Sequence, residues 1–205
     1  MSILRTSLAV ALLGAGGWLT CGAVLQDQDP AKDMQAAMAE GMKKWQESCT
    51  PGPSHKDLAR FVGSWDTETT ILGMGPEPMT SQGTAEWKWL FEGRWIQLNS
   101  SGELMGRPYH NQMTMGYDNF RQKYTTAGVD DMQTVLLTTE GSFDQSRQAL
   151  IMYGNIDEPM TGEIAKPVKS IWRFAGPDKF THEVHDLAIG ETNTKVFEIV
   201  YTRRK

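Results

Sequence analysis

Cysteine is almost absent from this 205-residue sequence, which contains Cys21 and Cys49 and no other. Removal of the N-terminal leader considered below would take Cys21 with it, and a single remaining cysteine forms no intramolecular disulfide. We therefore expect the fold to be stabilised by a hydrophobic core alone, for which a chain of this length is large enough.

Clustered positive charge is also lacking. The formal net charge is −5, and Lys and Arg form a run only at the last residues, 203–205. Because phosphate contacts need grouped cations, we expect no nucleic-acid partner. The sequence has no nucleophile elbow, phosphate loop, dinucleotide fingerprint or internal repeat, which excludes the commonest hydrolase and nucleotide-binding motifs and a propeller fold.

The first residues have the pattern of a secretory leader. Arg5 precedes an apolar run over residues 7–19, and Cys21-Gly22-Ala23 supplies the small residues of a cleavage site. We predict a signal peptide at 1–23 and an exported protein, periplasmic or secreted. The apolar run is too short for a comfortable membrane span, so none is expected after cleavage. The alternatives are an uncleaved anchor and a lipoprotein anchored at Cys21, although Leu19-Thr20 fits a lipoprotein signal poorly.

A linker and an amphipathic helix are expected over residues 24–54. Asp29 is a suitable N-cap, Pro30 a suitable first helical residue, and the helix is predicted over 30–47. One apolar stripe with spacings of four, four and three residues runs along it: Met34, Met38, Met42 and Trp45. We expect this stripe to dock on the rest of the protein, and a partner-binding surface is the alternative.

From Val62 onward, apolar and polar residues alternate with a period of two. Ten such segments are separated by turns rich in Gly, Pro, Asn and Asp, and none is followed by a helical pattern. We place strands at 65–71, 85–89, 94–99, 113–117, 122–129, 134–143, 149–156, 168–174, 179–187 and 194–203, with a longer loop at 157–167. The pattern predicts an all-β domain over 55–205, a single antiparallel up-and-down barrel of about ten strands, because closure removes unpaired edges.

Gly63-Ser64-Trp65, at the start of the first strand, resembles the Gly-x-Trp motif of calycins such as the lipocalins. The resemblance implies that the Trp65 indole plugs the floor of the barrel. It also implies that an arginine of the last strand, Arg203 or Arg204, packs over the indole.

A wider set of segments carries a second resemblance: 51–56, 62–66, 93–95, 105–108, 116–119, 123–124, 159–162 and 201–203, together with Asp130 and Met132. These segments resemble the bacterial domain-of-unknown-function family 1579, a calycin-like family with a lipocalin or nitrobindin type of barrel. The resemblance covers about residues 50–205 and implies a fold but no activity. One position departs from the family pattern, because Gly128 stands where we expect a tryptophan.

The inner face of such a barrel is either a filled core or the wall of a pocket for one small molecule. We predict a binding protein rather than an enzyme, with a small apolar or amphipathic ligand in the barrel. The residues predicted to contact this ligand are Trp65, Trp87, Trp89, Arg94, Met115, Tyr117, Tyr124, Glu183 and Arg203.

Two histidines of one strand offer the alternatives. His182 and His185 point to opposite faces of a regular strand, so they cannot hold one metal ion together, whereas Glu183 and His185 share a face. Noncovalent haem or a metal held by His182 or His185 is one alternative function. An enzyme that uses Glu183 and His185 as acid and base is another, which an inward-facing pair in a wet cleft would favour. His55 is expected to cap the barrel end, and a residue that lines a site at the rim is the alternative.

Overall fold

A computed structural model describes residues 29–73, 75–91, 93–187 and 193–205. The chain divides into two units, 1–42 and 43–205. The predicted signal peptide and Cys21 lie outside the described residues.

The predicted helix is present as α1, Pro30–Cys49, two residues longer than expected. Its N-cap is the predicted one, because the Asp29 carboxylate accepts a hydrogen bond of 3.1 Å from the Ala31 amide. The helix buries none of its residues, and its docking on the barrel stays a prediction. No helix in the described part of the chain combines the length and the apolar character that crossing a bilayer requires.

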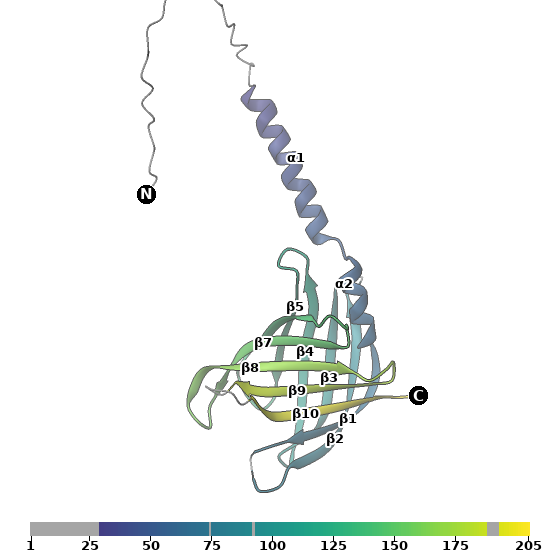
Figure 1. The fold of residues 1–205 in the computed structure, drawn as a ribbon, viewed down its shortest axis with the longest axis vertical. Coiled ribbons are helices and arrows are strands. Elements are labelled where there is room, and N and C mark those ends of the chain that lie inside the picture. Colours follow the sequence, from purple (N-terminus) through teal and green to yellow (C-terminus); the bar gives the residue numbers. More distant parts are fainter. Residues whose placement is uncertain (1–28, 74, 92, 188–192) are drawn as a thin grey trace, which may run out of the picture. The chain divides into compact units, whose positions relative to one another are not determined.

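Ten antiparallel strands form one closed barrel in which each strand pairs with its neighbours in the sequence and β1 pairs with β10 (Figure 1). This confirms the predicted fold class. The strands are β1 (Gly63–Ile71), β2 (Met79–Leu90), β3 (Trp95–Leu104), β4 (Arg107–Asp118), β5 (Lys123–Asp130), β6 (Leu137–Phe143), β7 (Ala149–Glu158), β8 (Glu163–Phe174), β9 (Lys179–Leu187) and β10 (Asn193–Arg203).

A short helix, α2 (Pro53–Lys56), and a 3₁₀ turn, η1 (Asp57–Arg60), precede β1 and close one end of the barrel. The Phe61 ring that follows lies 4.9–5.5 Å from the rings of Trp87, Trp172, Phe174 and Phe180. Leu58 and Phe61 are fully buried. We call this the capped end, and the opposite end the mouth.

The Gly-x-Trp motif acts as predicted. Trp65 is fully buried and donates a hydrogen bond of 2.8 Å to the Phe61 carbonyl. The guanidinium carbon of Arg203 lies 4.0 Å from the centre of the Trp65 ring system. A Cβ atom on Gly63 would fall 2.3 Å from Nη1 of Arg203, so only glycine leaves room for this arginine. Of the two candidates, Arg203 is therefore the one that packs over the indole.

The longest predicted loop proved shorter than expected. We predicted a loop at 157–167, but β7 continues to Glu158 and β8 begins at Glu163. Pro159 and Gly162, from which the loop was predicted, do lie in the connection between these strands. Pro167 is a residue type that is rare inside strands. Here it pairs with Asn155 in the middle of the β7–β8 ladder.

Candidate functional site

The inside of the barrel has two different halves. Residues paired directly across neighbouring strands lie on the same face, so the ladders that include Trp65, Trp87 and Trp172 identify the inner face. Near the capped end, the aromatic residues that form the floor, among them Trp65, Trp87 and Trp172, are at most 1% exposed. Toward the mouth, inner positions on all ten strands keep partial exposure: Thr69, Ser81, Ser100, Tyr109, Asn111, Met113, Asp130, Leu137, Thr139, Ile156, Lys166, Val184 and Ile199. Water therefore reaches the inner wall from the mouth.

His182 lies on the inner face next to this boundary. Its ring stacks on Trp172 with 3.7 Å between ring centres and 1° between planes, and its Nε2 is 2.8 Å from the Ser170 hydroxyl. Ser170 and His182 are both buried, and the His182 side chain is 9% exposed. Burial lowers the pKa of His182 to about 3, so the ring is neutral at physiological pH.

Two hydrogen-bond donors in the floor have no acceptor among the described residues. They are the indole N–H groups of Trp87 and Trp172, both fully buried. The two ring systems are 5.9 Å apart in an edge-to-face arrangement. A buried donor without a protein acceptor is satisfied by an ordered water or by a polar atom of a ligand.

Charged residues of the inner face gather at the mouth. Nζ of Lys166 lies 2.8 Å from Asp186 and 3.5 Å from Glu163, and the pKa of Lys166 is raised, chiefly by its hydrogen bond to Asp186. Burial, together with the charge of Asp130, raises the pKa of Tyr109 to about 12. The inner wall thus changes from aromatic at the floor to polar and charged at the mouth.

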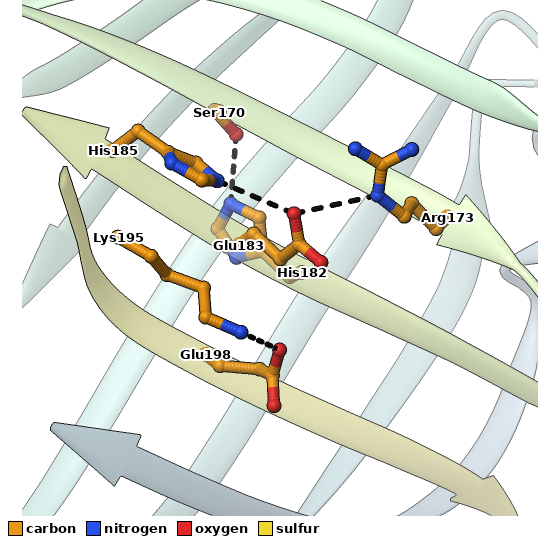
Figure 2. Close-up of polar contacts among 7 residues, drawn as sticks. All are labelled: Ser170, Arg173, His182, Glu183, His185, Lys195 and Glu198. Atoms are coloured by element: carbon orange, nitrogen blue, oxygen red, sulfur yellow. Dashed lines mark hydrogen bonds and ion pairs between the residues drawn. The ribbon is translucent and has the colours of Figure 1, made fainter. Parts of the chain in front are cut away.

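Glu183 and His185 face the outside of the barrel, not the inside (Figure 2). A Glu183 oxygen is 3.3 Å from His185 Nε2 and 3.3 Å from Arg173 Nε. Burial opposes ionisation of this carboxyl, but the hydrogen bond from His185 and the charge of Arg173 outweigh it, and the pKa of Glu183 lies below its ordinary value. The inward-facing pair that would favour an acid–base enzyme is therefore not formed.

The predicted opposite orientation of the two histidines is confirmed. His182 pairs with the inner residue Trp172, whereas His185 pairs with Lys169 on the other face. The described ranges contain no group of three or more His, Cys, Asp or Glu side chains placed to hold a metal ion. His182 would have to give up its hydrogen bond to Ser170 before its Nε2 could ligate haem iron, so the inner face does not present this nitrogen ready for a haem.

The other predicted ligand contacts lie at or near the capped end. Trp65, Trp87 and Met115 are fully buried in the floor. Tyr117 contacts His55 and Tyr124, and Tyr124 donates to the Ser54 carbonyl and to Asp57. Arg94 and the 39%-exposed Trp89 belong to the β2–β3 hairpin. The structure therefore places most of these residues below or beside the accessible half, and their contact with a ligand stays a prediction.

The sequence prediction missed the residues that line the accessible half. Ser170, Tyr109, Lys166 and Asp186 were not selected, because each resembles an ordinary strand or loop residue in the sequence. One available signal was the period of two, which places Ser170 on the same face as Trp172 and Phe174.

Comparison with known proteins identifies a family and a fold. The model of the family described as "Protein of unknown function (DUF1579)" matches residues 50–203. No curated protein matches the chain.

Two solved structures share the architecture. Rv2717c from M. tuberculosis is 13% identical, with a TM-score of 0.55 over 76% of this chain and 100% of the other. The S-type phycobiliprotein lyase CPES from Guillardia theta is 10% identical, with a TM-score of 0.53 over 74% of this chain and 93% of the other. At these identities the likeness concerns the fold alone.

Proposed function

Since the chain belongs to the DUF1579 family, we propose that its barrel binds one small apolar or amphipathic molecule in the half that opens at the mouth. The ligand's apolar part lies against Met113, Leu137 and Ile199, and its polar part lies toward Lys166 and Asp186.

The observation that carries the proposal is the partial exposure of inner residues on all ten strands toward the mouth. Barrels of this size are either filled by side chains or hold one ligand. Many inner positions of this half carry small side chains, such as Thr69, Ser81 and Ser100, which fill less of the interior than the aromatic residues of the floor do. The closed aromatic floor stops the ligand from passing through.

The departure at Gly128 supports the same proposal. This glycine is buried on the inner face, where it pairs with Met113 and Leu137. A large side chain at this position would project into the barrel. Its absence adds space in the half that we propose for the ligand.

An enzyme on the same scaffold is the alternative. One structural neighbour is named as an enzyme, a phycobiliprotein lyase, so this fold also occurs in an enzyme. The pair that we predicted as acid and base, Glu183 and His185, faces outward. Binding is therefore the function that the geometry supports better.

Native mass spectrometry of the protein purified from an export-competent host tests the proposal, with dodecanol and dodecanoate added in a second sample. We expect an additional mass, either of a co-purified apolar molecule or of one of the added compounds. A bare polypeptide mass in both samples would contradict binding. The mass of haem with a Soret absorbance band would replace the proposal by the haem alternative.

Export of the protein is part of the proposal, and the leader at 1–23 supports it. The intact mass of the same preparation tests it. Loss of residues 1–23 is expected. A full-length mass in the cytosolic fraction would contradict export, and a lipid-modified Cys21 would identify a lipoprotein instead.

A further inference from the structure

Exposed aromatic side chains gather at the capped end. Phe91 is 73% exposed and Phe120 88% exposed, and each occupies the tip of a hairpin, β2–β3 and β4–β5 respectively. Trp89 and Trp95, at the strand ends beside Phe91, are 39% and 36% exposed. Consecutive strands run in opposite directions, so both hairpins lie at the end where β1 begins.

Both tips are held in place by hydrogen bonds. The Asp118 carboxylate accepts from the amides of Phe120 and Arg121 at 2.8 and 3.0 Å. Arg94 donates to the Phe91 carbonyl at 3.2 Å. The Trp95 ring covers Gly116 of β4 so closely that a Cβ there would fall 2.3 Å from it. The two aromatic tips therefore belong to one firm surface formed by β2 to β5.

Neither phenylalanine helps the fold in the way a core residue does. A mostly exposed phenyl ring forgoes the stabilisation that burial brings. Phe91 also has φ +50°, in the left-handed region that glycine and asparagine adopt more easily than an aromatic residue. Several exposed aromatic rings grouped at one end of a molecule are the feature expected of a surface that binds something.

The charge of this end distinguishes it from the rest of a net acidic protein. Among the described residues of the segments at the capped end, ten are Lys or Arg and four are Asp or Glu: 53–62, 90–95, 118–123, 144–148, 175–179 and 203–205. The connections at the mouth and the strand ends beside them show the reverse, with eight Asp or Glu and two Lys or Arg among their described residues: 72–78, 103–108, 130–136, 157–166 and 186–187.

Trp and Phe flanked by Lys and Arg match the interface of an anionic bilayer, where aromatic rings enter the headgroup region and cations meet lipid phosphates. We propose that the capped end docks on an anionic lipid membrane through Phe91 and Phe120, with the mouth facing away from it. The acidic mouth disfavours the opposite orientation by repulsion. This proposal does not depend on the ligand in the barrel.

Flotation of the exported protein with vesicles tests the docking, using phosphatidylcholine vesicles with and without phosphatidylglycerol. We expect binding to the anionic vesicles, falling as salt is raised, because each Lys or Arg near such a surface contributes about fivefold to partitioning. The double variant Phe91→Asn, Phe120→Ser is expected to lose at least about tenfold. Asparagine suits the backbone of residue 91, so this variant should fold.

The mouth provides a matched control in Met105→Asn, Met160→Ser. Met105 also has a positive φ, +53°, and the two methionines are 51% and 77% exposed. This control should bind as the unsubstituted chain does. All variants are purified in the exported form, from which residues 1–23 are expected to be lost, so the apolar run at 7–19 does not contribute to vesicle binding. Equal vesicle binding by the two double variants, or no preference for anionic vesicles, would overturn the proposal. Equal retention of both double variants on a soluble polyanion such as single-stranded DNA, without vesicle binding, would overturn it too.

Discussion

A histidine that stays neutral inside the barrel couples the stability of this protein to pH. His182 binds a proton in the unfolded chain below its ordinary pKa of 6.5, but in the folded barrel only near pH 3. The unfolded state therefore binds more protons between these values, and the free energy of unfolding falls as pH falls from about 6.5 toward 3.

The substitution His182→Gln should remove this part of the pH dependence. Glutamine is polar and does not titrate, so it can still bond to Ser170. We expect the unsubstituted protein to lose roughly 2 kcal/mol more than the variant between pH 7 and about pH 4.5. Urea unfolding at both values measures the difference. Parallel pH profiles for the two proteins would contradict the assigned burial of His182.

Arg203 is a second residue whose chemistry is specific. Besides covering Trp65, it donates to the carbonyls of Val62 and Pro177 at 2.9 and 3.1 Å. Lysine cannot reproduce a planar group with several donors, so Arg203→Lys should lower the free energy of unfolding by about 2 kcal/mol.

The neighbouring substitution Arg204→Lys is the control for Arg203→Lys. Arg204 makes an exposed ion pair with Asp66 at 2.6 Å, and such pairs contribute at most about 1 kcal/mol. Denaturant midpoints of both variants give the comparison. If both substitutions lowered the free energy of unfolding equally, the packing of Arg203 over Trp65 would have no special role.

At the scale of secondary-structure elements, α2 and η1 act as the closure of the capped end. The Tyr124 hydroxyl donates to the Ser54 carbonyl and to Asp57 at 2.9 and 2.8 Å, and Arg147 forms an ion pair with Asp57. Arg60 lies over Phe174, 3.6 Å from its ring centre. Strands β5, β6–β7 and β8 are thereby tied to the residues that precede β1.

Removal of one hydroxyl tests this closure. Tyr124→Phe should lower the free energy of unfolding by about 1 kcal/mol and speed amide hydrogen exchange over residues 54–61. The control Tyr153→Phe, at a 53%-exposed tyrosine on β7, should change neither the free energy of unfolding nor the exchange over residues 54–61. Unchanged exchange in the Tyr124 variant would mean that aromatic packing alone holds the closure.

The strands themselves were predictable, but their ends toward the mouth were not. The sequence predicted strands at 85–89, 94–99 and 113–117, whereas β2, β3 and β4 span Met79–Leu90, Trp95–Leu104 and Arg107–Asp118. The added residues lie mainly toward the mouth, where inner positions such as Ser81, Ser100 and Asn111 are polar and partly exposed. Alternation fades there because the inner face borders water instead of packed side chains.

The candidate site was less predictable than the fold for the same reason. Periodicity identifies buried aromatic residues, so the selected set described the floor, and it gave no sign that Lys166 and Asp186 meet across β8 and β9. The outward position of Glu183 and His185 depends on the register between strands. Spacing within one strand does not determine which of its faces points inward.

At the scale of the whole molecule, the barrel has two unlike ends. The capped end is aromatic and basic, and the mouth is acidic and leads to a partly accessible inner wall. Our two proposals give the ends different tasks, a membrane contact at the capped end and ligand entry at the mouth. The central claim is the second, that the half of the barrel next to the mouth is a binding site.

Titration with the neutral apolar fluorophore N-phenyl-1-naphthylamine, compared between Gly128→Trp and Val129→Trp, tests this claim most directly. A Cβ at residue 128 would lie 3.3 Å from the Gln112 carbonyl oxygen and 3.4–3.5 Å from the Met113 side chain, so the first side-chain atom of an inner tryptophan requires only a small shift of these neighbours. Val129 is 47% exposed and supplies the same side chain on the outer face. We predict probe binding by the unsubstituted protein and by Val129→Trp, and its loss in Gly128→Trp with folding unchanged by circular dichroism. Equal binding by both folded variants, or none by the unsubstituted protein, would contradict a ligand site inside the barrel.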